Sequence, residues 1–185
     1  SEKVLYHQLL DLYATSVDYD PKTPETAQFF AVVQNKLQYA AHGHTAAEVI
    51  VERADATQPN MGLTSFTGQR PRKSDSVAKN YLKEPELKRL NTLVSAYFDA
   101  AEFRAQSHEP TSMRDWLGHL DRLIIAMGAE ALIGAGTVSR AAAVNRAEGE
   151  YALYRAHLDE ERSAVEAEYL KTIKRAEKSV EGPQR

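Results

Sequence analysis

The sequence predicts an all-α protein, in which a compact helical bundle is followed by one long charged helix. Apolar residues recur three or four positions apart in most segments, which is the spacing of one helix face. No segment alternates apolar and polar residues over the length of a strand. After two glycines at 134 and 136, residues 137–180 contain no proline and a single glycine, so we expect one very long helix there.

Composition and charge narrow the class of protein. The 185 residues are 43% hydrophobic and 26% charged, as in an ordinary globular protein, and they suffice for one domain with a sizeable core. The formal net charge of -3 gives no overall field that would attract nucleic acid. The chain has no cysteine, which excludes disulfides and thiolate metal sites and fits a reducing cytoplasm.

The sequence has no segment suited to a membrane. No apolar run approaches the roughly 18 to 20 residues that span a bilayer, and the first residues lack the apolar stretch of a signal peptide. We therefore expect a cytoplasmic protein without membrane contact. The first residue is not methionine, so we also expect the sequence to be part of a longer protein.

The first two helices have recognisable ends. A helix over about residues 4–17 should end at residues 18–21, because the residue before Pro21 is excluded from the α region. The next helix should begin at residues 23–25, where Thr caps, Pro suits the first position and Glu complements the helix dipole. Gly43 should end it. Its apolar stripe consists of Phe29, Phe30, Val33, Leu37 and Ala40.

A third, short helix is expected over residues 45–54. Thr45 and Glu48 have the spacing of a capping box, in which each side chain bonds the backbone N–H of the other residue. The apolar residues that follow point almost all round the helix axis, and such helices are usually buried. We therefore predict that this segment forms the core around which the bundle packs.

A long connection, residues 55–75, follows and is rich in Pro, Gly, Thr and Ser. Loops of this length inside a compact domain tend to be functional or disordered. Met61, Leu63 and Phe66 within it predict an ordered loop that packs on the core. A short helix or turn is expected at residues 77–82.

The remaining chain predicts three more helices. One begins at Pro85, and another begins at Ser112, which has capping-box spacing to Asp115. The long segment 137–180 has apolar residues that resemble a heptad seam, although Glu161 falls where an apolar residue would be expected. We expect residues 1–136 to form the core domain. Residues 137–185 should form a helix that projects, pairs with a copy of itself or folds back onto the domain.

Several short segments occur in a characteristic order and at characteristic separations. They are residues 18–21 (DYDP), 33–37 (VQNKL), 43–48 (GHTAAE), 52–56 (ERADA), 59–65 (PNMGLTS), 72–75 (RKSD), 77–82 (VAKNYL) and 113–116 (MRDW). In these segments the sequence resembles the RhuM virulence protein family, and the resemblance covers about residues 1 to 155.

The resemblance implies a bacterial protein of a family named for a pathogenicity-island member and often encoded near restriction-modification genes. It also implies an N-terminal DNA-binding-like domain that this sequence does not include. Some related proteins are described as fused to Fic/Doc-type domains. The family has no securely established catalytic residues, so none are carried over to this sequence.

The loop contains a candidate site for phosphate or nucleic acid. Arg70, Arg72 and Lys73 lie close together on a segment with Gly and Pro, and Lys79 lies just beyond. Arg can bind a phosphate through two hydrogen bonds and Lys supplies a point charge. The alternative is a basic loop that is simply solvated.

A second candidate is a polar pocket formed by Asn35, His42, His44 and Asn60. Asn35 interrupts an apolar helix and must be hydrogen-bonded if buried, which we expect to happen with the loop at residues 55–66. Asn60 is suited either to such a pocket or to fixing the turn before Gly62. One His-x-His pair is too weak a pattern to predict a metal site, and no cofactor is expected.

Two functional hypotheses follow. The favoured one is a non-enzymatic interaction and oligomerisation domain, accessory to a DNA-binding N-terminal domain, with a second copy or a partner helix as its partner. Nucleic acid would then be bound through the full-length protein. The alternative is a degenerate Fic-like, nucleotide- or nucleic-acid-processing domain. Its pocket would lie near His44, Asn60 and Arg72, at a helix N-terminus that could hold phosphate.

Overall fold

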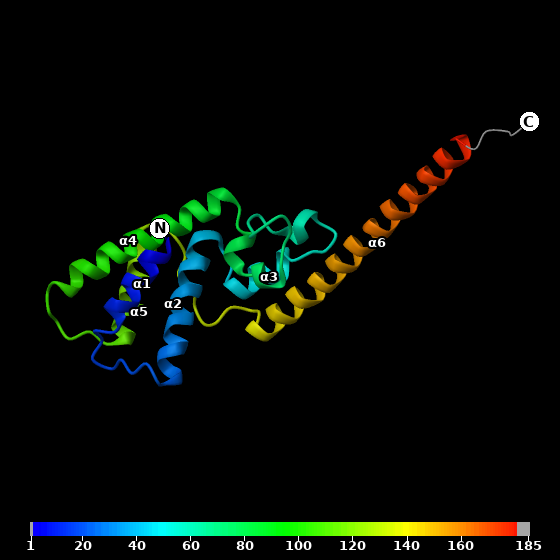
Figure 1. Ribbon diagram of the computed structural model, residues 1–185. Coiled ribbons are helices and arrows are strands. Elements are labelled where there is room, and N and C mark those ends of the chain that lie inside the picture. Colours follow the sequence, from blue (N-terminus) through cyan, green and yellow to red (C-terminus); the bar gives the residue numbers. More distant parts are fainter. Residues whose placement is uncertain (1, 181–185) are drawn as a thin grey trace, which may run out of the picture.

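The computed structural model describes residues 2–180, with the side chains of residues 7–177, and these residues form helices and loops without strands. The all-α prediction is confirmed. In chain order the helices are α1 (Glu2–Tyr13), α2 (Pro24–His42), α3 (Ala46–Arg53), the 3-10 helices η1 (Pro59–Gly62), η2 (Lys73–Asp75) and η3 (Ala78–Tyr81), α4 (Glu84–Ala105), α5 (Met113–Ala126) and α6 (Arg140–Val180) (Figure 1).

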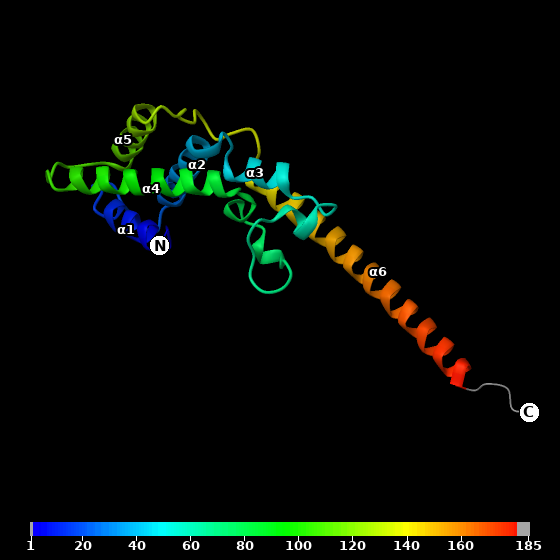
Figure 2. The same ribbon diagram turned by 90° about the horizontal axis from the view of Figure 1, so that it is seen from above.

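Four helices form the bundle. The central one is α4, which contacts α1, α2 and α5, while α2 also contacts α5 (Figure 2). Their shared core includes an aromatic cluster around Tyr13, which is 1% exposed. The ring of Tyr13 meets that of Phe29 edge-to-face at 4.8 Å and lies 6.1 Å from that of Trp116. Each such pair contributes about 0.5–1.5 kcal/mol beyond its burial.

Most predicted helix ends are confirmed by their capping bonds, but α1 ends at Tyr13, four residues before the predicted end, because the N–H groups of Thr15 and Ser16 bond carbonyls only three residues back. Thr23 accepts a hydrogen bond from the N–H of Thr26, and Gly43 ends α2. Thr45 and Ser112 each begin a helix with a complete capping box. These ends could be predicted because the bonds join residues only three positions apart.

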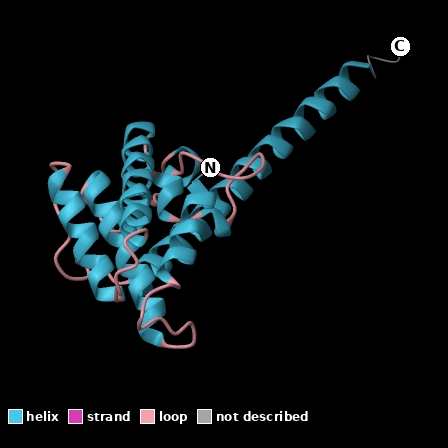
Figure 3. Ribbon diagram, turned by 90° about the vertical axis from the view of Figure 1, so that its left-hand side faces the viewer, coloured by secondary structure: helices cyan, strands magenta, loops and turns pink. Residues whose placement is uncertain are grey.

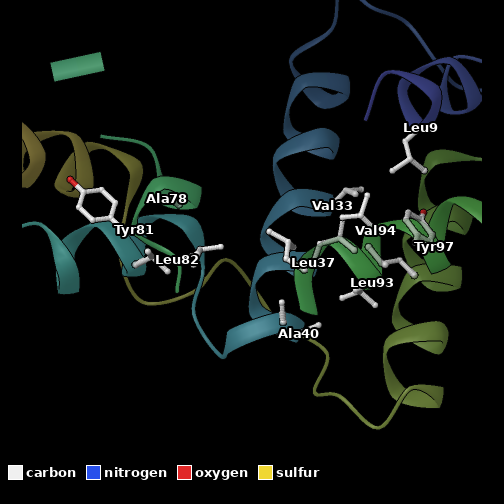
Figure 4. Packing of buried hydrophobic residues seen from close by; sticks show 14 of the residues in the cluster. Leu9, Val33, Leu37, Ala40, Ala78, Tyr81, Leu82, Leu93, Val94 and Tyr97 are labelled. Carbon is white, nitrogen blue, oxygen red and sulfur yellow. The ribbon is translucent and has the colours of Figure 1, made fainter. Parts of the chain in front are cut away.

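The place of α3 differs from the prediction. Within this helix only Val49 is fully buried, and the other side chains are half-buried or exposed. The reason is its position at one end of the bundle, where its faces contact three different elements: α2, η3 and α6. The centre of the bundle therefore lies among α1, α2, α4 and α5, and α3 links this core to α6 (Figure 4).

The loop between α3 and α4 is ordered, as predicted. Met61 and Leu63 are buried, at 0% and 5% exposure. The chain turns through three successive left-handed residues ending at Gly62, where a side chain would collide with the carbonyl oxygen of Arg53. Thr64 then closes the loop by donating its N–H and hydroxyl to the carbonyl oxygen of Asn80.

Among the described residues, the first part of α6 packs on the other elements and the later part does not. The helix contacts α3, η1 and η2, and then runs out from the domain (Figures 1 and 3). From residue 159 to residue 177 every side chain is exposed except that of Ile173, which is half-buried. None of the helices in the described part of the chain is both long enough and apolar enough to cross a membrane.

Candidate functional site

The most distinctive surface of the molecule is an apolar stripe along α6. On the packed part, Ala143, Ala147 and Tyr154 are buried against the domain. Eleven residues after Tyr154 comes Val165, which is 70% exposed, and eleven residues after Leu158 comes Tyr169, which is 66% exposed. Eleven residues make about three turns of a helix, so these side chains continue the buried stripe into solvent.

The spacing of the stripe also fits an eleven-residue repeat, beside the predicted heptad seam. Residues eleven positions apart lie on the same face of the helix, and Glu161 comes eleven residues after Glu150. Glu150 is a polar member of the packed face, buried at 8% exposure. A carboxylate at residue 161 therefore matches the pattern of α6, whereas it would interrupt a seven-residue repeat.

The charges of the projecting part are separated along its length. Residues 159–168 carry five carboxylates and one Arg, a formal charge of -4. Residues 170–177 carry three cations and one carboxylate, a formal charge of +2. The acidic block begins 19 residues after the first residue of α6, and the helix dipole acts only within the end turns, so the dipole does not account for this block.

Polar contacts hold the packed part of α6 against the loop. The buried carboxylate of Glu150 accepts a hydrogen bond of 2.7 Å from the N–H of Ala56 and pairs with Arg146 at 2.8 Å. Lys73 pairs with Glu148 at 2.8 Å. One cation of the predicted basic loop therefore binds the protein itself.

The other predicted basic residues have different surroundings. Arg70, Arg72 and Lys79 are exposed. The ion pairs that join described residues include none made by Arg70 or Arg72. Their role as phosphate or nucleic-acid contacts remains a prediction.

The structure brings together three of the four predicted pocket residues. The rings of His42 and His44 are stacked with centroids 6.2 Å apart, and Asn35 accepts a hydrogen bond from the N–H of Ala46 nearby. Asn35 therefore bonds the start of α3 instead of the loop at residues 55–66. Asn60 is exposed on η1, a helix that packs on α6, and its left-handed backbone fits the turn interpretation.

Both histidines already have partners. His42 Nε2 lies 2.6 Å from Gln38 Oε1, and His44 Nε2 lies 2.9 Å from Glu52 Oε2. Burial is the main cause that lowers the pKa of His42. The described residues include no cluster of three or more His, Asp or Glu side chains placed to share a metal ion.

The start of α3 is covered by the loop before α6. Thr137 donates its N–H and its hydroxyl to Glu48 Oε1, and a side chain on Gly136 would collide with Thr45. The hydrogen bonds from the N–H groups of Thr137 and Thr45 lower the pKa of Glu48 to about 2. A phosphate at this helix end would need amides that already bond side chains, and it would meet a carboxylate.

Sequence reasoning missed two groups of charged residues. Arg53 forms a two-pronged ion pair with Glu86, with both N–O distances 2.7 Å, and this pair lowers the pKa of Glu86 to about 2. Arg104, His119 and Arg122 gather between α4 and α5. The only sequence signal for the second group is the i, i+3 spacing of His119 and Arg122 on α5.

Comparison with known protein families identifies the chain. A family model described as the virulence protein RhuM family matches residues 1–162 of the chain, which confirms the resemblance and extends it slightly. No curated protein and no solved structure matches. The matched region includes the packed part of α6, whereas most of the projecting part lies beyond it.

Proposed function

The chain belongs to the RhuM virulence family, and we propose that it acts as a cytoplasmic self-association module. In this proposal the projecting part of α6 pairs with the same part of a second copy. The observation that carries it is the apolar stripe, which is buried at Tyr154 and exposed to solvent at Val165 and Tyr169. Apolar stripes on projecting helices are stabilised when a second helix covers them.

The charges favour a second copy as the occupant of this stripe. The helix carries an acidic block at residues 159–168 and a basic block at residues 170–177, so it is complementary to itself. In an antiparallel pair the acidic block of each copy faces the basic block of the other. In a parallel pair like charges would face each other along the whole contact, which is unfavourable. We therefore propose an antiparallel pair centred near Tyr169.

Contacts within one helix use only part of these charges. Arg162 pairs with Glu166 at 3.0 Å, and Lys171 lies 3.6 Å from Glu168. The triplet at residues 159–161 has two nearby cations within the same helix, Arg155 four residues before Asp159 and Arg162 directly after Glu161. In an antiparallel pair centred near Tyr169, Lys171, Lys174 and Arg175 of one copy lie opposite residues 163–167 of the other, beside its Glu166 and Glu168.

Pairing would give the protein a two-fold axis across the helices. An antiparallel dimer places its two domains at opposite ends of the paired segments. The family resemblance implies a DNA-binding-like domain before this region. Two linked copies of such a domain would bind one DNA molecule with a higher effective concentration than either alone. This role requires no catalytic residues.

The first test is the mass of the chain in solution, measured by light scattering over a range of concentrations. We expect a dimer for the natural sequence and a monomer for the double variant Val165→Ser, Tyr169→Ser. The control is Leu170→Ser, because Leu170 is also exposed but lies about 100° further round the helix. A monomer at every concentration, or equal dissociation by Leu170→Ser, would contradict the proposal.

The second test determines the direction of pairing by disulfide cross-linking. The natural chain contains no cysteine, so each introduced cysteine can react only with another introduced cysteine. Val165→Cys and Ile173→Cys variants are mixed and oxidised, and the products are separated on a non-reducing gel. An antiparallel pair centred near Tyr169 brings residue 165 of one copy opposite residue 173 of the other, so the mixed product should dominate. A parallel pair would join each variant to itself.

A further inference from the structure

A cavity of about 200 Å³ lies between α4 and α5, away from α3 and α6. Tyr97 and Arg104 line it from α4, and Trp116, His119 and Arg122 line it from α5. None of the residues that line this cavity belongs to the apolar stripe of α6. Any ligand bound here would therefore act independently of self-association.

The polar groups that line the cavity are rich in unused hydrogen-bond donors. The indole Nε1 of Trp116 and the Nε of Arg104 are both buried and have no acceptor among the described residues. Buried donors in native proteins nearly always have a partner, and a ligand in this cavity would supply acceptors that the described residues do not. The hydroxyl of Tyr97 is already used, because it donates to the carbonyl oxygen of Trp116 at 3.1 Å.

His119 adds a third donor. Arg122 lies 2.7 Å from His119 Nδ1, and because a guanidinium can only donate, Nδ1 must accept. The neutral imidazole then carries its proton on Nε2. Burial first, and then the charges of Arg104 and Arg122, lower the pKa of His119, which favours this neutral form.

Cations line the cavity, and two carboxylates lie close to them. Two guanidinium groups belong to the lining, Glu109 pairs with Arg104, and the charge of Asp115 acts on Arg104 and His119. Glu109 lies 3.5 Å from Arg104 and is 65% exposed, so solvent screens this pair. Asp115 accepts hydrogen bonds from the N–H and hydroxyl of Ser112.

We propose that this cavity binds the phosphate group of a small molecule. Two guanidinium groups offer paired N–H donors to phosphate oxygens, and the indole and imidazole N–H groups add single donors. The volume of the cavity suits a phosphate with a small substituent and is below that of typical pockets for larger ligands. The site belongs to the bundle, inside the part of the chain that the family model matches.

The test uses Trp116, the only tryptophan of the chain, as a fluorescent reporter. Inorganic phosphate is added to the full chain, with sodium chloride of equal ionic strength as reference and sodium acetate as a second anion. We expect a saturable change with phosphate alone. No saturable change, or an equal response to acetate, would overturn the assignment to phosphate.

Matched variants separate a built site from a general electrostatic effect. Arg104→Gln and Arg122→Gln each remove donors from the cavity and should weaken phosphate binding about tenfold or more. Arg114→Gln removes the same charge from an exposed position on α5 that does not line the cavity, so binding should be unchanged. Circular dichroism confirms that each variant is folded. Equal weakening by Arg114→Gln would contradict the proposal.

Discussion

The two parts of α6 carry the same apolar stripe in different surroundings. On the packed part, residues of the stripe such as Ala143 and Tyr154 are covered by α3 and the loop that follows it. On the projecting part, the corresponding Val165 is exposed to solvent. A helix of 41 residues therefore continues past the domain that stabilises its first half.

The charged residues of the two parts also differ in burial and in their partners. Glu150 on the packed part is buried and bonds both the N–H of Ala56 and the side chain of Arg146. Glu166 on the projecting part is exposed, and its one ion pair among the described side chains is with Arg162 on the same helix. Polar residues on the first part therefore hold the helix to the domain, whereas those on the second part are available to a partner.

The largest expected effect on the free energy of unfolding comes from replacing a tyrosine of the packed part, compared with a tyrosine of the projecting part. Tyr154→Ala should lower the free energy of unfolding by about 3 kcal/mol, because it leaves a cavity in the packed stripe. Tyr169→Ala should change it by about 0.5 kcal/mol or less in dilute, monomeric protein, since Tyr169 is exposed. Urea unfolding measures both. Equal losses would show that the projecting part also packs on its own domain.

Much of the fold could be predicted from the sequence because its signals are local. Capping boxes at Thr45 and Ser112 and the stop at Gly43 depend on residues three or four positions apart. The ordered loop could be predicted from Met61 and Leu63, since apolar residues in a polar loop need a core to pack on.

The features that sequence reasoning missed depend on distant contacts. An apolar pattern shows that α3 is covered but not by which elements, so its place at the end of the bundle was not evident. The apolar stripe of α6 could be read as far as residue 180, but the point where it leaves the domain depends on where α3 and the loop end. The partner of Asn35 and the gathering of Arg104 with Arg122 likewise arise only when separate helices meet.

A smaller effect on stability is expected for Glu48, which bonds the loop just before α6. Glu48 holds Thr137, three residues before α6, and its pKa is lowered from 4.5 to about 2 by hydrogen bonds from Thr137 and Thr45. A carboxyl with a lowered folded-state pKa stabilises the fold above its unfolded value. This contribution is therefore complete above pH 4.5 and is lost as the pH falls towards about 2.

Glu48→Gln tests this pH dependence. The variant should be less stable than the natural chain at neutral pH, and the difference should shrink as the pH falls through the interval from 4.5 to about 2. Urea unfolding across this interval measures it. Glu86 titrates in the same interval but is present in both proteins, so the comparison isolates Glu48. A difference that stays constant with pH would show that the bond to Thr137 does not depend on the charge.

The smallest effect on the free energy of unfolding is expected for the ion pair between Arg162 and Glu166 on the projecting part of α6. Arg162 and Glu166 are four residues apart, 3.0 Å between their closest atoms, and their side chains are 78% and 62% exposed. Exposed pairs of this spacing contribute about 0.3–0.5 kcal/mol to a helix and less at high salt. Arg162→Ala should therefore leave urea unfolding of the dilute chain almost unchanged. A loss as large as that for Tyr154→Ala would mean that this part of α6 is also held by the domain, and the contrast between the two parts would disappear.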